Sequence, residues 1–93
     1  MTTRELVWSE RAEGVLVALA ERNRPLAIRV DEVAFGLQED PHPPGVRKLG
    51  ISVWCVELPE GIRITYVIEP TRVLVARISN AKKDATPPPP GSA

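Results

Sequence analysis

The chain has 93 residues, with twelve acidic and twelve basic side chains and therefore no formal net charge. This length corresponds to a single domain. The composition, with 43% hydrophobic and 26% charged residues, is typical of a globular protein rather than a disordered or fibrous one. We expect a cytoplasmic protein, because no apolar run reaches the roughly 18 residues of a membrane span and no signal-peptide pattern follows Met1. One cysteine and one histidine cannot form an internal disulfide or a structural zinc site. We expect no metal and no cofactor.

The charges are distributed unevenly along the chain. Residues 1–45 contain five basic and eight acidic side chains, a net −3, whereas residues 46–93 contain seven basic and four acidic ones, a net +3. Two interpretations fit this asymmetry equally: the second half faces an anionic partner, or the signs are a solvated mixture.

The first half predicts a short strand followed by two helices. Residues 4–8 have strand propensity, and Ser9 is suited to cap a helix over residues 9–22 whose first turn is acidic. Pro25 suits the first turn of a second helix. The apolar stripes of the two helices comprise Ala12, Val15, Leu16 and Leu19, and Leu26, Val30, Val33 and Leu37. The two helices therefore form a hairpin.

The second half predicts a β-hairpin. Asp40–Gly45, with three prolines, ends the second helix, and the hydrophobic period then changes from 3.6 to 2 in Ser52–Leu58 and Ile62–Glu69. The connecting loop Pro59–Gly61, with glycine in a left-handed bulge position, keeps both apolar sets on one face. This register places three pairs opposite each other: Glu57 with Arg63, Cys55 with Thr65, and Trp54 with Tyr66.

A third strand is predicted over residues 72–79, and it completes the fold. Its predicted core-facing residues are Leu74, Ala76 and Ile78, and its outward residues are Val73, Val75 and Arg77. Residues 80–93 contain four consecutive prolines and predict a disordered tail with polyproline character. Residues 1–79 are thus expected to form an α+β domain in the order strand, helix, helix, strand, strand, strand, with the helical hairpin on one face of a small, mostly antiparallel sheet.

Several segments, in this order and spacing, carry a family resemblance: Val7–Ser9, Gly45–Leu49, Val53–Val56, Gly61–Tyr66 and Val73–Ile78. Together they resemble the RelE/ParE superfamily, the toxins of bacterial type II toxin–antitoxin pairs. The resemblance implies a RelE-like fold and a cytoplasmic toxin that a small antitoxin neutralises. For the ribonuclease members it implies translation inhibition by metal-independent cleavage of ribosome-bound mRNA, in which a 2′-hydroxyl attacks the adjacent phosphate.

The resemblance also assigns roles to basic residues. Arg63 matches the arginine that stabilises the phosphate, and Lys83 matches an arginine beyond the last strand, so both are catalytic candidates. A guanidinium fork is suited to a phosphate. The RNA-binding candidates are Arg47, Lys48, Arg77 and Lys82.

Three departures from the ribonuclease pattern leave the enzymatic activity open. Cys55 and Glu57 occupy positions where the best-known ribonucleases have lysines, and Pro87–Pro90 replace a tyrosine near the carboxyl end. The position of Arg63 opposite Glu57 fits two interpretations equally: a catalytic arginine, or one partner of a structural cross-strand ion pair. The alternatives to a ribonuclease are a catalytically degenerate module that pairs with an antitoxin, and a gyrase-directed toxin.

Overall fold

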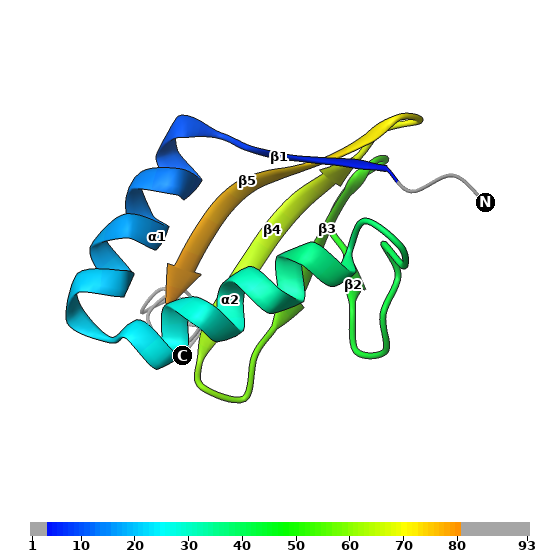
Figure 1. The fold of residues 1–93 in the computed structure, drawn as a ribbon. Helices are drawn as coiled ribbons and strands as arrows, with labels where there is room; N and C mark the ends of the chain where they lie inside the picture. The colour runs from blue at the N-terminus through cyan, green and yellow to red at the C-terminus, as the bar shows by residue number, and fades with distance from the viewer. Residues whose placement is uncertain (1–3, 81–93) are drawn as a thin grey trace, which may run out of the picture.

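The computed structural model describes residues 4–80, which form two helices and a five-stranded sheet (Figure 1). In chain order the elements are β1 (Glu5–Trp8), α1 (Glu10–Arg22), α2 (Arg24–Gly36), β2 (Arg47–Lys48), β3 (Val53–Glu57), β4 (Ile62–Ile68) and β5 (Arg72–Asn80). The predicted α+β order is confirmed, with β2 as an additional short strand. Residue 80 belongs to β5, and the rest of the predicted tail lies outside the described residues.

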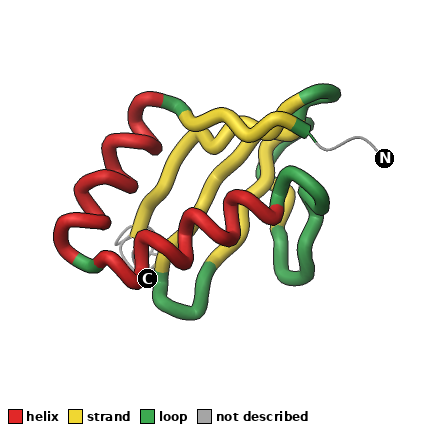
Figure 2. The backbone as a smooth tube through the Cα atoms, viewed as in Figure 1, coloured by secondary structure: helices red, strands yellow, loops and turns green. Residues whose placement is uncertain are grey.

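Both helices lie on the same face of the sheet, whose strand order is β1-β5-β4-β3-β2 (Figure 2). The first strand pairs with the last in parallel, and the other three pairings are antiparallel, as expected for a mostly antiparallel sheet. Neither of the two helices in residues 4–80 combines the length and the hydrophobicity of a transmembrane helix.

Ser9 begins α1 and also ties it to the sheet. Its Oγ accepts a hydrogen bond from the amide of Ala12 at 3.0 Å and donates one to the carbonyl of Ala76 at 2.8 Å. Asn23 ends α1 and caps α2, since its Oδ1 accepts a hydrogen bond from the amide of Leu26 at 3.2 Å. Pro25 lies in the first turn of α2, where its missing N–H costs no helical hydrogen bond. The predicted extent of α1 and the predicted start of α2 are therefore confirmed, whereas α2 ends at Gly36, before the Asp40–Gly45 segment that was expected to end it.

Replacing Ser9 by alanine is expected to lower the free energy of unfolding by about 1 to 2 kcal/mol, because an N-cap bond and a bond to β5 are both lost. Urea denaturation followed by circular dichroism measures this change. Ser52→Ala is the matched control, since the Ser52 hydroxyl makes no hydrogen bond within the described part of the chain. Equal losses in the two variants would contradict the capping role.

The register of the β3–β4 hairpin is the predicted one. Glu57 pairs with Arg63, and the other two predicted pairs, Cys55 with Thr65 and Trp54 with Tyr66, are also present. The amide of Leu58 donates to the carbonyl of Ile62, and Gly61 has a φ of 90°, a value that glycine adopts without strain.

A β-bulge interrupts the alternation of β5. Thr65 of β4 pairs with Arg77, whereas the next residue, Tyr66, pairs with Val75, so that Ala76 is the extra residue. Side chains on the two sides of the bulge therefore follow opposite parity.

The bulge accounts for a wrong prediction. Val73 and Val75, predicted to face outward, are completely buried, whereas Leu74 and Ala76, predicted to join the core, are only half-buried. Ile78, beyond the bulge, is buried as predicted.

The core lies between the helices and the sheet, and three alanines contribute to it. Ala12, Ala27 and Ala34 are buried on the helix faces that meet the sheet, where small side chains permit close approach. The predicted stripes hold except for Val15, which is exposed. Their other members are buried or, in the case of Leu16, Leu26 and Val33, half-buried and packed against the core.

Candidate functional site

The sheet face opposite the helices carries a group of polar side chains, which we call the outer face. Directly paired strand residues point to the same side, so the pairings place these residues together. The outer face comprises Arg47 of β2, Cys55 and Glu57 of β3, Arg63 and Thr65 of β4, and Arg77 and Ser79 of β5. Three of the predicted site residues, all arginines, thus lie on one surface.

Glu57 lies at the centre of an ion-pair cluster on this face. Arg63 donates to its Oε1 from Nη2 at 2.9 Å and from Nε at 3.2 Å. Arg47 donates to the same oxygen from Nη2 at 3.0 Å. The exposed fraction of the side chain is 20% for Arg63, 43% for Glu57 and 59% for Arg47.

This geometry confirms the interpretation of Arg63 and Glu57 as a cross-strand ion pair. An exposed pair of this kind stabilises the fold by at most about 1 kcal/mol, because water and salt screen it. The cluster with Arg47 contains two positive charges and one negative charge. Glu57 therefore contacts both arginines directly and leaves the cluster with one surplus positive charge.

The structure separates the predicted RNA-binding pair Arg47 and Lys48. Adjacent strand residues point to opposite faces, and Lys48 pairs with Trp54 on the helix side. Its Nζ lies 5.5 Å from the centroid of the Trp54 ring, which also meets His42 edge to face at 4.6 Å. Lys48 and Arg47 thus point to opposite faces of the sheet, and Lys48 makes a cation–π contact with Trp54, while its predicted role in RNA binding stays a prediction.

Of the remaining basic candidates, the structure describes Arg77 but not Lys82 or Lys83. Arg77 lies on the outer face opposite Thr65 and is exposed. Lys82 and Lys83 lie outside the described residues, so their predicted roles stay predictions. Within residues 4–80 there is no group of three or more His, Cys, Asp or Glu side chains that could hold a metal ion.

Cys55 lies beside the ion-pair cluster but is only 1% exposed. Its cross-strand neighbours are Arg47 on one side and Thr65 on the other. The structure thus confirms that Cys55 is a small buried residue, and a thiol this inaccessible is poorly suited to act as a nucleophile.

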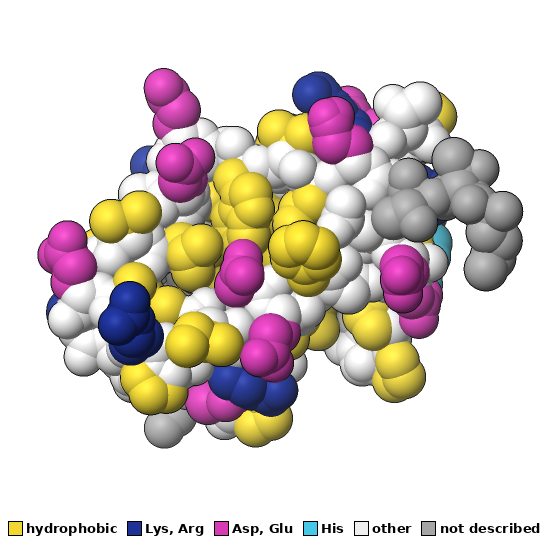
Figure 3. All heavy atoms as spheres, in the orientation of Figure 1, with side chains coloured by type: hydrophobic (Ala, Val, Ile, Leu, Met, Phe, Trp, Pro, Cys, Tyr) yellow, Lys and Arg dark blue, Asp and Glu magenta, His cyan; other side chains and the backbone are white. Residues whose placement is uncertain are grey.

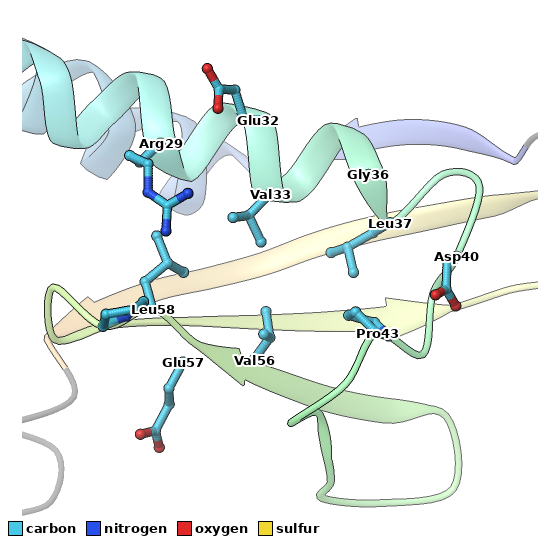
Figure 4. A pocket seen from close by; sticks show the side chains of 11 residues that line it. Arg29, Glu32, Val33, Gly36, Leu37, Asp40, Pro43, Val56, Glu57 and Leu58 are labelled. Carbon is cyan, nitrogen blue, oxygen red and sulfur yellow. The ribbon is translucent and has the colours of Figure 1, made fainter.

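A cavity of about 440 Å³ opens on the helix side between α2 and β3. In Figure 4, Val33, Leu37 and Val56 point into it, whereas the carboxylate of Glu57 points to the other side of β3. Figure 3, which views the helix side of the molecule, shows apolar side chains gathered between the two helices and β1, with charged side chains around them. The sequence did not predict this cavity, which is lined by Val33 of the predicted apolar stripe.

The sequence matches no protein-family model and no curated protein. Its fold, in contrast, matches solved structures closely. A YoeB/ParE toxin from Agrobacterium tumefaciens superposes with a TM-score of 0.70 at 13% identity, over 82% of this chain and 96% of that one. A chain of the RelBE2 toxin–antitoxin complex from Mycobacterium tuberculosis superposes with a TM-score of 0.69 at 22% identity, over 86% of this chain and 93% of that one.

A third match is a chain of a chromosomal ParDE toxin–antitoxin system from P. aeruginosa, with a TM-score of 0.70 at 16% identity, over 84% of this chain and 96% of that one. Each likeness covers nearly the whole of the matched chain, and at these identities it concerns the backbone arrangement. The helical hairpin and the sheet described above are therefore the fold of the YoeB, RelE and ParE toxins.

Proposed function

We propose that this protein is the toxin of a type II toxin–antitoxin pair and cleaves ribosome-bound mRNA, with Arg63 stabilising the phosphate under attack. The observation that carries the proposal is the position of Arg63 on the outer face of a fold shared with toxins. Two of the matched structures come from toxin–antitoxin systems, which supports a small antitoxin as the partner.

The proposed chemistry requires positive charge close to the phosphate, because negative charge develops there during the reaction. The 2′-hydroxyl gives up its proton as it bonds to phosphorus, and the 5′-oxygen takes up a proton as its own bond to phosphorus breaks. Negative charge builds on the phosphate oxygens during this exchange, and a fixed guanidinium stabilises that charge. Arg63 is the least exposed residue of the ion-pair cluster, so its guanidinium is the best fixed in place. Arg47 supplies a second charge beside it, and Arg77, Lys82 and Lys83 are the further proposed contacts to RNA.

A second candidate is a noncatalytic module that binds an antitoxin without cleaving RNA. The observation that favours it is the carboxylate of Glu57, which occupies the Nε and Nη2 edge of Arg63. An anion at this position competes with a phosphate for the same donors.

Expression without antitoxin tests the proposal. We expect the wild-type chain to arrest growth and cleave mRNA, and Arg63→Ala to reduce cleavage by about 100- to 1,000-fold, the usual effect of removing one fixed charge donor. Arg29→Ala is the matched control, because Arg29 also forms a 3.0 Å ion pair with a glutamate, Glu60, but away from the outer face. It should retain full activity.

Three results would overturn parts of the proposal. Undiminished cleavage by Arg63→Ala would remove its assigned role. Harmless overexpression of the wild-type chain, together with tight antitoxin binding, would establish the noncatalytic candidate. Growth arrest with intact mRNA and inhibited DNA supercoiling would identify a gyrase-directed toxin.

A further inference from the structure

Glu57 is held between two arginines that come from the strands on either side of it. Arg47 reaches it from β2 and Arg63 from β4, and β3 lies between these strands in the sheet. All three hydrogen bonds end on a single oxygen, Oε1, at 2.9 to 3.2 Å. The arginines thus converge on one point in space, which a negatively charged oxygen occupies.

The donors at that point suit a phosphate as well as a carboxylate. Arg63 presents Nε and Nη2, the edge of the guanidinium that binds carboxylate and phosphate oxygens in pairs. Arg47 adds a third donor from the opposite side. Once the carboxylate leaves, these donors can hold one phosphate oxygen between them.

The carboxylate is also free to leave. Glu57 is 43% exposed and Arg47 is 59% exposed, so the cluster lies in contact with water. Exposed ion pairs of this kind are weak, because solvent screens the charges and competes for the donors. Rotation of the Glu57 side chain toward solvent therefore opens the site without a change in the backbone.

We propose that Arg47 and Arg63 form a binding site for an RNA phosphate, and that the carboxylate of Glu57 occupies this site in the free protein. Glu57 is thus an internal competitor that lowers the affinity of the outer face for RNA. This inference rests on the proposed function, since it explains how an RNA-binding site and an acidic residue share one surface.

Glu57→Gln tests the competition, because it removes the charge and keeps the size of the side chain. The probe is a short fluorescein-labelled oligouridine, titrated with purified protein and followed by fluorescence anisotropy. We expect Glu57→Gln to bind it about five- to tenfold more tightly than the wild type, the effect of removing one unit charge about 4 Å away in water.

Two further variants make the test specific to this site. Glu60→Gln removes the same charge from a glutamate paired with Arg29, and we expect it to bind RNA like the wild type. In the double variant Glu57→Gln/Arg63→Gln the gain should disappear. A gain of equal size in Glu60→Gln, or a gain that persists in the double variant, would overturn the inference. Circular dichroism spectra verify that all the variants are folded.

The binding assay separates this inference from the proposed function, because it contains no ribosome and measures no cleavage. Tighter binding by Glu57→Gln in a protein that never arrests growth would support the masked site and overturn the ribonuclease proposal. Growth arrest that depends on Arg63, with no gain of affinity in Glu57→Gln, would overturn the masked site alone.

Discussion

Replacing Ile64 by alanine is expected to lower the free energy of unfolding by about 4 kcal/mol, within the range of about 2 to 5 kcal/mol for a buried isoleucine. Ile64 is completely buried in β4, the central strand of the sheet. Its cross-strand neighbours are Val56 and Ile78, which are also buried. Strands paired on both sides cannot collapse into the space that the side chain leaves, so we expect a value in the upper part of the range.

A domain of this size is typically stable by about 5 to 15 kcal/mol, so this loss is a large part of the total. Urea denaturation measures it. Ile51→Ala is the matched control, because Ile51 is 94% exposed and the same atoms are removed. We expect this control to change stability by less than about 0.5 kcal/mol. Similar losses in both variants would show that Ile64 does not lie in the core.

The hairpin could be predicted residue by residue because two independent signals agree on its register. The apolar alternation of β3 and β4 and the position of Gly61 in the loop both require Leu58 to meet Ile62. From this register the contact between Glu57 and Arg63 follows directly. This part of the candidate site was therefore available from the sequence.

The rest of the site depends on features that leave little trace in a sequence. β2 has only two residues, too few to show an alternating pattern, so the opposite orientations of Arg47 and Lys48 could not be predicted. The bulge at Ala76 is one extra residue within an apolar run, and either parity of β5 fits the hydrophobic pattern equally. The third contact of the cluster, from Arg47 to Glu57, is visible only in the folded chain.

The buried faces of the helices were predicted less completely than the hairpin, because some of the residues that pack against the sheet are alanines. A pattern of large apolar residues selects Leu26 and Val33, but α2 buries Ala27 and Ala34 against the sheet. Small residues at these positions bring the helix close, and the larger side chains then lie at the margin of the core. Val33 consequently lines the cavity between α2 and β3.

Tyr66→Phe is the second substitution with a large expected effect, about 1 to 3 kcal/mol in the free energy of unfolding. Tyr66 is completely buried, and its hydroxyl donates a hydrogen bond of 2.7 Å to the carbonyl of Pro41. Phenylalanine leaves that carbonyl without its partner in a buried position, and the cost of an unsatisfied buried acceptor sets the expected loss. The bond also joins β4 to the loop after α2, so the variant loosens this connection.

The ionisation of Tyr66 provides a test of the same burial. Burial raises the pKa of the phenol well above its usual value of 10.0, and the electrostatic effects of the neighbouring Cys55 and Asp40 raise it further. The folded protein therefore holds the proton where the unfolded chain releases it. The contribution of the protonated Tyr66 to the free energy of unfolding is complete below about pH 10. Above that pH it decreases by about 1.4 kcal/mol per pH unit.

We therefore expect the stability advantage of the wild type over Tyr66→Phe to decrease above about pH 10, where the unfolded chain begins to ionise. Urea denaturation at several pH values measures the difference, and the comparison cancels the titration of groups that both proteins share. Because Tyr66 is the only tyrosine in the sequence, the ultraviolet absorbance of phenolate reports on this side chain alone. A phenolate signal from the folded protein near pH 10, or a constant difference in stability, would show that the hydroxyl is not held in the buried bond to Pro41.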